Sequence, residues 1–436
     1  MEAYNLVSFL GIFALLGFAW LLSPHKKNLN WRVIIFGLGL QMLFALFIFV
    51  VPAGSKLFLF INDFVIKVLD CASAGTRFVF GRLALPPGTT NAAGEPSLGF
   101  FLAFQALPTI IFFSALMSVL YFLKIMPWLI KKFALVFSKL MRISGAESLC
   151  AASNIFVGIE SALTIKPFLS EMTRSELCTV LTAGMATVAS NVLAIYVFTL
   201  KDQFPTIAGH LVSASFLAAP SALIMSKILL PETEKPKTLG RSVSPFYEKE
   251  QNLFEAVING ANTGVKVVVG IVALLLAVLG LVALADLFMG ALGGKINSLA
   301  GLQIDWSLKG FMGYVFYPFT LIIGVPISDA GIIAKIIGER TIVTEVAAYQ
   351  DLAVVMGKQL LQHPRSAVIA TYVLCGFAHV ASIAIFVGGI SALAPERTHD
   401  LAGVGFRALL AATLACMLTG CIAGAFFMKG SVLMGG

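Results

Sequence analysis

The sequence predicts an all-α polytopic membrane protein, with about eight transmembrane helices and two re-entrant helical hairpins in inverted repeats. Hydrophobic residues make up 58% of the 436 residues and charged residues 12%, and the mean hydropathy is +0.93, a composition foreign to soluble domains. Apolar stretches of roughly 20 residues, long enough to span a bilayer, recur from end to end. Two other stretches, 143–172 and 325–360, hold too many small, polar or charged residues for lipid-facing helices, which predicts hairpins.

The predicted spans follow the apolar stretches, and the basic residues between them set the orientation. Transmembrane helices are expected at about 5–23, 33–52, 98–123, 174–200, 207–230, 258–290, 366–393 and 403–428. The basic turn with Lys26, Lys27 and Arg32 places the first connection in the cytoplasm and the N-terminus outside. The first span is expected to be a retained helix, because Glu2 stands where a signal peptide carries basic residues.

The connections between spans divide the chain into four expected parts. Residues 53–97 predict an interfacial amphipathic segment with an external loop, 231–250 a polar cytoplasmic linker, and 290–310 a second external connection. Counting crossings puts both termini outside. The parts are the N-terminal helices with the interfacial segment (1–142), the first hairpin with its repeat helices (143–230), the cytoplasmic loop with a long scaffold helix and external connection (231–310), and the second hairpin with its repeat helix and the C-terminal helix (311–436).

The composition and the motifs argue against several classes of function. The net charge of +8 comes from Lys and Arg in loops between apolar spans, a positive-inside pattern, so nucleic acid is not an expected partner. The six cysteines have no paired or metal-like spacing. Phosphate-binding loops, nucleophile elbows and HExxH are absent from the sequence, so an enzyme is not expected and uphill transport must use an ion gradient.

A short internal repeat relates the two halves of the chain. Residues 184–190 (GMATVAS) and 376–382 (GFAHVAS) agree at five of seven positions. Chance among small residues could produce such a match, but each copy also follows a hairpin with a buried acid, Glu160 or Glu345, and then an Arg-Ser pair. Paired broken segments in corresponding positions point to a midplane binding site of a secondary transporter.

The two acids are the first candidates for a functional role. An ionisable group at membrane depth costs at least about 2.5 kcal/mol and is rarely kept without a task or a partner. The alternative for each acid is an internal ion pair, with Lys166 for Glu160 or Arg340 for Glu345.

Polar residues near the hairpins and the repeat are further candidates. Asn154 and Thr187 offer uncharged oxygens that suit Na⁺, although a buried Asn also bonds to neighbouring helices. His379 occupies the repeat position of Thr187 and could titrate near neutral pH or serve as a helix contact. Phe377 could stack on a planar ligand or pack in the core, and Ser382 is an ordinary small interface residue by default.

Three blocks of sequence resemble the concentrative nucleoside transporter family, and the likeness covers nearly the whole chain. The blocks are SNIFVGIESALTIKPFLSEMTRSEL at 153–177, GVPISDAGIIAKIIGERTIVTEVAAYQDL at 324–352 and CGFAHVASIAI at 375–385. The first two are similar to the family's two hairpin motifs, and the third to a span with Cys-Gly-Phe-Ala-Asn. The resemblance implies a homotrimer in the plasma (inner) membrane, in which a transport domain carries a nucleoside with Na⁺ or H⁺ past a scaffold.

The resemblance also implies roles for individual residues. Glu160 corresponds to the acid that contacts the nucleobase, and Glu345 to the acid that contacts the ribose hydroxyls. The other implied substrate positions are Val192, Phe377 and Ser382, and the implied Na⁺ ligands are Asn154, Thr187 and the backbone carbonyls of Val157 and Val188.

Three substrate positions depart from the family pattern. Ile159 stands where the family has a Gln-Thr/Ser pair, Thr344 replaces an Asn, and His379 replaces an Asn that shares in ribose binding. Lost polar partners change discrimination strongly, so substrate choice is expected to shift more than the transport cycle. The leading hypothesis is therefore a Na⁺-coupled (or H⁺-coupled) nucleoside symporter. The alternatives are an ion-coupled transporter of another small polar metabolite, with His379 and H⁺ taking part, and a channel-like or receptor protein on the same fold.

Overall fold

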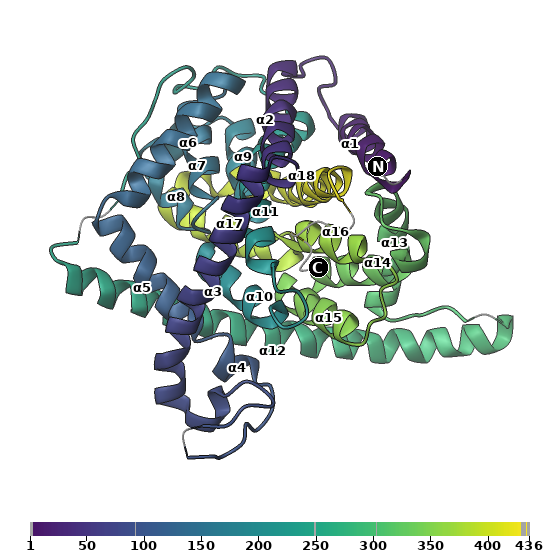
Figure 1. Cartoon of the computed structure of the whole chain (residues 1–436). Coiled ribbons are helices and arrows are strands. Elements are labelled where there is room, and N and C mark those ends of the chain that lie inside the picture. Colours follow the sequence, from purple (N-terminus) through teal and green to yellow (C-terminus); the bar gives the residue numbers. More distant parts are fainter. Residues whose placement is uncertain (1–2, 92, 248–249, 302, 429–432, 434–436) are drawn as a thin grey trace.

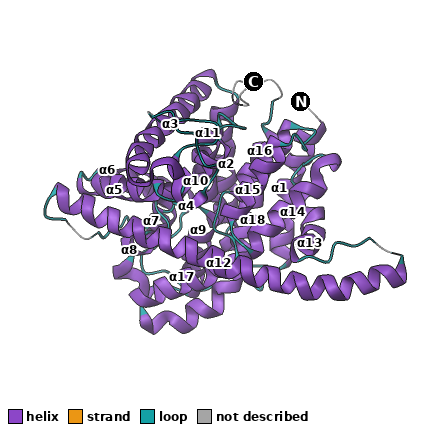
Figure 2. Cartoon of the chain, turned by 90° about the horizontal axis from the view of Figure 1, so that it is seen from below, coloured by secondary structure: helices purple, strands orange, loops and turns teal. Residues whose placement is uncertain are grey.

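The computed structural model describes residues 3–91, 93–247, 250–301, 303–428 and 433, and its regular structure there is helical apart from two isolated bridges (Figures 1 and 2). The helices are α1 (Ala3–Leu21), α2 (Trp31–Phe49), α3 (Pro52–Phe80), η1 (Gly81–Ala84), α4 (Leu102–Gln105), α5 (Thr109–Phe122), α6 (Ile125–Met141), α7 (Gly145–Ser153), α8 (Ser161–Thr164), η2 (Lys166–Glu171), α9 (Arg174–Ala186), α10 (Ser190–Leu200), α11 (Ile207–Leu229), α12 (Leu253–Ala300), α13 (Leu308–Ile322), α14 (Ile327–Ile342), α15 (Glu345–Gly357), α16 (Pro364–Leu374), α17 (Val380–Leu393), η3 (Pro395–Arg397) and α18 (Thr398–Ala425).

The prediction of about eight spans is confirmed. Within the described residues, seven helical stretches are long and apolar enough to cross a membrane: Ala3–Leu21, Trp31–Phe49, Leu102–Phe122, Arg174–Leu200, Ile207–Leu229, Leu253–Ala300 and Pro395–Ala425. The remaining predicted span, 366–393, is split into α16 and α17, which have 11 and 14 residues, so neither half reaches that length alone.

The helices differ sharply in how far they are buried. The α9–α10 stretch is 94% buried and α11 is 89% buried, whereas α12 is only 6% buried. Figure 1 shows α12 as a long rod along one side of the molecule, while α9, α11 and α18 lie inside. Helices that are apolar on all sides and buried form a core, and α12 presents its leucines to lipid or to a partner.

Helix α12 packs on α5 through small residues. A Cβ atom on Gly260 would lie 2.7 Å from the Ala115 Cα, and one on Gly264 would lie 2.6 Å from the Ile111 Cα. Glycines spaced four apart let two helix backbones approach closely where no hydrophobic effect drives association. This contact fixes the position of α12 beside the rest of the protein.

Two helix–break–helix segments match the predicted hairpins. The first runs from α7 through a break at 154–160 into α8 and η2, and the second joins α14 to α15 at 343–344. A capping box between Ser144 and Glu147 begins α7, since each side chain bonds to the other's backbone amide. Such boxes satisfy amides that the first helical turn leaves without partners.

The boundaries differ from the predictions in two places. Residues 290–300, expected in an external connection, extend α12 to Ala300, where Gly301 ends the helix with a φ of +66°. The basic residues after the third span lie on an amphipathic helix, α6, that the sequence reading did not identify. The polar linker between α11 and α12 is non-helical at its described residues, 230–247 and 250–252, and it contacts the base of the first hairpin through an isolated bridge between Ser144 and Leu239.

Candidate solute and ion site

The two copies of the internal repeat mark two breaks in otherwise continuous spans. Helix α9 ends at Ala186 and α10 begins at Ser190, while α16 ends at Leu374 and α17 begins at Val380. We call residues 187–189 the first break and residues 375–379 the second break. Broken helices at membrane depth free backbone carbonyl and amide groups for ligands.

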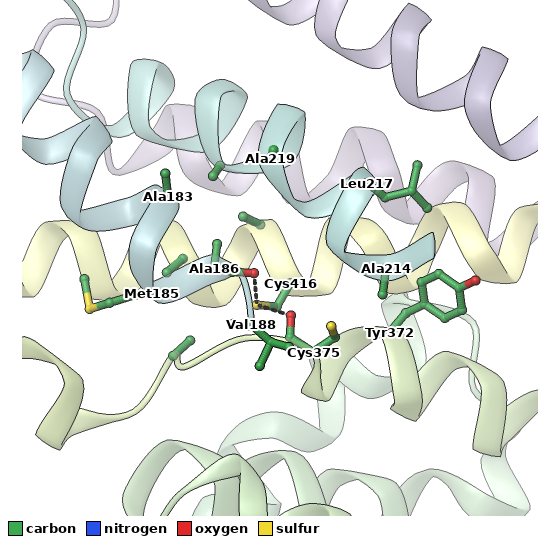
Figure 3. Packing of buried hydrophobic residues seen from close by; sticks show 14 of the residues in the cluster. Ala183, Met185, Ala186, Val188, Ala214, Leu217, Ala219, Tyr372, Cys375 and Cys416 are labelled. Atoms are coloured by element: carbon green, nitrogen blue, oxygen red, sulfur yellow. Dashed lines mark hydrogen bonds between the residues drawn. The ribbon is translucent and has the colours of Figure 1, made fainter. Parts of the chain in front are cut away.

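The two breaks pack against each other at Cys416 of α18 (Figure 3). The Cys416 thiol donates to the Ala186 carbonyl at 3.6 Å and to the Cys375 carbonyl at 3.9 Å. Gly376 permits this approach, because a Cβ atom there would lie 2.7 Å from both the Ala186 carbonyl oxygen and the Cys416 Sγ. In the first repeat, Gly184 makes room for the ring of Phe386. The glycines that the two copies share therefore serve close packing in both.

The first break lies against the tip of the first hairpin. The Ser190 amide donates to the Phe156 carbonyl at 3.0 Å, which ties the start of α10 to the hairpin break. Asn154 is the C-cap residue of α7, and Thr187 is the C-cap residue of α9. Two helix C-termini thus face this region, and each carries a partial negative charge that favours a cation.

Several oxygens near the first break have no hydrogen-bond donor among the described residues. The Asn154 amide nitrogen donates to the Cys150 carbonyl at 3.0 Å, but its Oδ1 is buried and unpartnered. The carbonyls of Val157 and Val188 also accept no hydrogen bond there. The Thr187 hydroxyl donates to the Ala183 carbonyl at 2.8 Å, which leaves its own lone pairs free. Uncharged oxygens of this kind are the ligand type that suits a weakly held Na⁺.

Glu160 lines a cavity beside the first hairpin. This cavity has a volume of about 450 Å³ and is lined by Glu160, Val157 and Asn191, with aromatic side chains that include Tyr121 and Tyr247. Mostly apolar walls with a few convergent polar groups are typical of small-molecule sites. The cavity could therefore accept a small solute with an aromatic ring.

Part of the cavity wall comes from the linker between α11 and α12. The Phe246 amide donates to the Thr164 carbonyl at 2.9 Å, and Lys166 lies over the Phe246 ring with its Nζ 6.0 Å from the centroid. Phe246 and Tyr247 both line the cavity. The linker therefore covers one side of the space in front of Glu160.

Glu345 lies in a buried polar cluster at the second break. Its Oε1 accepts a hydrogen bond of 2.8 Å from the Tyr196 hydroxyl, and its Oε2 lies 3.3 Å from the His379 Nε2. The side chains of Glu345 and His379 are each only 2% exposed. Tyr196 in turn stacks on Tyr349, with ring centroids 4.4 Å apart. Three elements, α10, the start of α15 and the second break, thus converge on one carboxylate.

The sequence reading missed Tyr196. It lies four residues after Val192 on α10, and residues four apart share a helix face. This spacing from a predicted substrate position was the signal in the sequence that could have identified Tyr196. The ion-pair alternative for Glu345 named the wrong partner, because Arg340 contacts α16 instead of Glu345. No Glu160–Lys166 pair occurs among the ion pairs of the described residues.

The remaining predicted residues have structural contacts of their own. Thr344 caps α15 and accepts from the Ala347 amide at 3.5 Å. Ser382 donates to the Phe377 carbonyl, and the Phe377 ring lies 6.5 Å from that of His379. Val192 is buried on α10. These positions cluster around the second break and α10, but they are not among the residues that line the Glu160 cavity.

Ile159 packs away from the cavity. A Cβ atom on Gly389 of α17 would collide with the Ile159 side chain, so the two residues are in close contact. The isoleucine at the hairpin tip therefore makes an apolar contact with the second repeat.

Family models identify the chain once this geometry is known. The family model for the N-terminus of Na⁺ dependent nucleoside transporters matches residues 10–83, and the model for their C-terminus matches residues 210–424. A third family model, described as nucleoside recognition, matches residues 103–203. The chain belongs to the concentrative nucleoside transporter family. As in that family, it is a multi-pass membrane protein.

Individual relatives agree with this assignment. Solute carrier family 28 member 3 of Mus musculus is 37% identical over 434 residues, which cover 96% of this chain but 58% of the relative, so the chain spans little more than half of that protein. The uncharacterized transporter YutK of Bacillus subtilis is 39% identical over 420 residues, covering 96% of this chain and 98% of the relative. The solved structure of CNTnw in an inward-facing substrate-bound state matches with a TM-score of 0.87 and 34% identity, covering 98% of each chain.

Proposed function

We propose that this protein is a secondary active symporter that imports nucleosides across the plasma membrane, driven by a Na⁺ gradient. The observation that carries the proposal is the unpartnered, buried Asn154 Oδ1 beside the free carbonyls of Val157 and Val188, next to the cavity of Glu160. Buried acceptors without donors are costly, and a bound cation would satisfy them.

The placement of helix ends supports separate ion and solute parts within one site. The C-termini of α7 and α9 face the proposed Na⁺ region, while Glu160 and Glu345 stand at the N-termini of α8 and α15. Helix N-termini favour negative charge and C-termini favour positive charge. Carboxylate oxygens at these positions offer acceptors for solute hydroxyl and N–H groups.

We assign Glu160 to the nucleobase and Glu345 to the ribose hydroxyls, with Val192, Phe377 and Ser382 at the surrounding wall. Ionised carboxylates offer about four lone-pair sites, and Tyr196 and His379 approach one oxygen each. Solute hydroxyls therefore share Glu345 with two protein groups, which supports a narrower substrate choice than a site without His379.

The assembly is also a proposal. Long stretches of α12 expose leucines, among them Leu276, Leu281 and Leu287, each more than 60% exposed. Continuous apolar faces of this kind mark lipid or partner contacts. They support a homotrimer in which α12 belongs to the scaffold and the two hairpins with the broken helices form the moving transport domain.

The Glu345–His379 pair favours one alternative, an H⁺-coupled transporter of a different small polar metabolite. Histidine serves as a proton shuttle in proteins, and the His379 Nε2 lies 3.3 Å from the Glu345 Oε2. Thr344 and Ile159 add to this alternative, because neither offers the amide groups that the family pattern has there.

Uptake of labelled uridine and adenosine into proteoliposomes, with and without a Na⁺ gradient, tests the proposal. Gradient-dependent uptake of either nucleoside supports the proposed symport. If no nucleoside shows such uptake, the proposed substrate class is wrong. Thermal stabilisation by nucleosides, bases and sugars separates the alternative, which needs a ligand that is not a nucleoside. A channel-like function predicts that Glu345→Gln leaves function intact.

A further inference from the structure

Arg340 is a buried charge that neither the solute nor the ion site uses. It lies near the C-terminal end of α14, its side chain is fully buried, and its Nη1 donates to the Val373 carbonyl at 2.6 Å. Its Nε and Nη2 atoms have no oxygen acceptor, the Cys416 sulfur is its other polar neighbour, and no carboxylate lies within ion-pair distance among the described residues. Cations are rarely kept at membrane depth without a task.

The position of Arg340 corresponds to that of Asn154 in the other repeat. Asn154 precedes the hairpin acid Glu160 by six residues, and Arg340 precedes Glu345 by five. Asn154 is the residue that caps the end of the first arm of its hairpin, and Arg340 lies in the last turn of the first arm of the other hairpin. Val373 belongs to the last turn of α16, directly before the second break, and the charge of Arg340 also acts on Cys375 and Cys416 beside that break.

The two repeats show complementary polar groups at these positions. The first break has acceptors without donors, namely the Asn154 Oδ1 and two valine carbonyls, whereas the second repeat has a guanidinium whose Nε and Nη2 have no oxygen acceptor. A helix that ends inside the protein leaves carbonyl groups unpaired and a partial negative charge at its C-terminus. Both α9 and α16 end in this way, so a positive charge is favourable at both breaks.

We propose that Arg340 is a fixed internal cation that neutralises the partial negative charge at the second break, as a bound Na⁺ does at the first break. Its guanidinium holds the carbonyl end of α16 and keeps the second break permanently neutralised. Only the first break is then open to a free ion, so transport uses one Na⁺ per protomer. This last step rests on the proposed Na⁺ coupling, whereas the role of Arg340 at α16 does not. Arg340 is a positioning residue.

The test compares Arg340→Gln, which keeps N–H donors on a shorter side chain but loses the charge, with Arg340→Lys, which keeps the charge. Thermal unfolding of the purified protein is measured against Na⁺ concentration, with choline as the control cation, in the presence and absence of Asn154→Ala. Asn154→Ala alone is expected to abolish Na⁺ stabilisation. In the Arg340→Gln background, Na⁺ is expected to stabilise the protein even with Asn154→Ala, because Na⁺ now enters the second break.

Uptake gives the second readout. The wild type and Arg340→Lys are expected to show a Hill coefficient for Na⁺ of about 1, and Arg340→Gln a value clearly above it with uptake reduced about tenfold at low Na⁺. An Arg340→Gln protein that folds but gains no new Na⁺ response, whether or not it transports, would overturn the proposal and leave Arg340 a packing anchor.

Two controls keep the result decisive. If Arg340→Gln does not fold, Arg340→Lys is compared with Arg340→Met. Folding of the Lys variant alone supports a required charge, and equal failure of both variants contradicts it. If the wild type shows no Na⁺ response, the proposed coupling fails, while the comparison of Lys with Met in choline still decides the role of Arg340.

Discussion

Gly376→Ala is expected to separate the two helix breaks. The added Cβ would lie 2.7 Å from the Ala186 carbonyl oxygen and 2.7 Å from the Cys416 Sγ, closer than carbon atoms approach either group. Backbone is on one side of this contact, so the strain cannot be relieved by a rotamer change alone. Overpacking of a buried site costs about 1–3 kcal/mol, and we expect a loss of stability in that range.

The same substitution is expected to weaken Na⁺ binding. Ala186 directly precedes Thr187 and Val188, so a displacement of its carbonyl moves two proposed ligands. Thermal unfolding in choline reports the loss of packing, and the half-saturating Na⁺ concentration for uptake reports the displaced ligands. The half-saturating concentration should rise several-fold.

Gly388→Ala is the matched control for this prediction. Gly388 lies on α17, and a Cβ atom there meets nothing within 4 Å. Alanine is favoured over glycine inside helices by about 0.5–1 kcal/mol, so the control should be neutral or slightly stabilising. Equal stability and equal Na⁺ dependence of the two alanine variants would refute the reasoning about the crossing of the breaks.

Three further predictions concern single groups. Asn154→Ala should remove Na⁺-dependent stabilisation in thermal unfolding while nucleoside stabilisation at saturating Na⁺ persists weakly; unchanged Na⁺ stabilisation would contradict the ligand assignment. Tyr196→Phe removes a hydrogen bond to the Glu345 carboxylate, worth about 1.5–3 kcal/mol for a charged acceptor, and should alter solute affinity by roughly tenfold or more in competition uptake; an unchanged affinity would exclude a coupling to the solute site. The Lys335 ammonium and the Ser307 hydroxyl lower the pKa of Asp305 from 3.8 to about 2, so the stability from this contact is present at neutral pH and is lost as the pH falls from about 4 towards 2. Asp305→Asn should therefore lower the unfolding temperature modestly at pH 7 and make progressively less difference in acid, and a pH-independent difference would count against the ion pair.

The breaks and hairpins could be predicted from the sequence because their signals are local. Glycine, small residues and a serine recur with one spacing in residues 184–190 and 376–382, and the structure places a helix break in each copy. A charged residue within an apolar stretch is equally visible. Local composition therefore locates these features, although it does not say what they contact.

Contacts between distant elements could not be predicted in the same way. Tyr196 is an ordinary aromatic residue in an apolar span until α15 brings Glu345 to it. Gly293 belongs to the stretch expected as a connection, yet it lies inside α12, where the ring of Trp306 packs on the space that a side chain would occupy. Arg340 was the nearest basic residue to Glu345 in sequence, but helix geometry directs it to α16.

The linker that covers the Glu160 cavity also limits how far the first hairpin can travel. Phe246 is hydrogen-bonded to the hairpin at Thr164, and α12 begins at Leu253. Fully extended chain covers at most about 3.6 Å per residue, so the seven steps between Phe246 and Leu253 reach roughly 25 Å. While that hydrogen bond is intact, Thr164 of the hairpin stays within about this distance of the start of α12. A longer movement of the hairpin requires the hydrogen bond between the Phe246 amide and the Thr164 carbonyl to break. This one hydrogen bond therefore limits the distance that the hairpin can move.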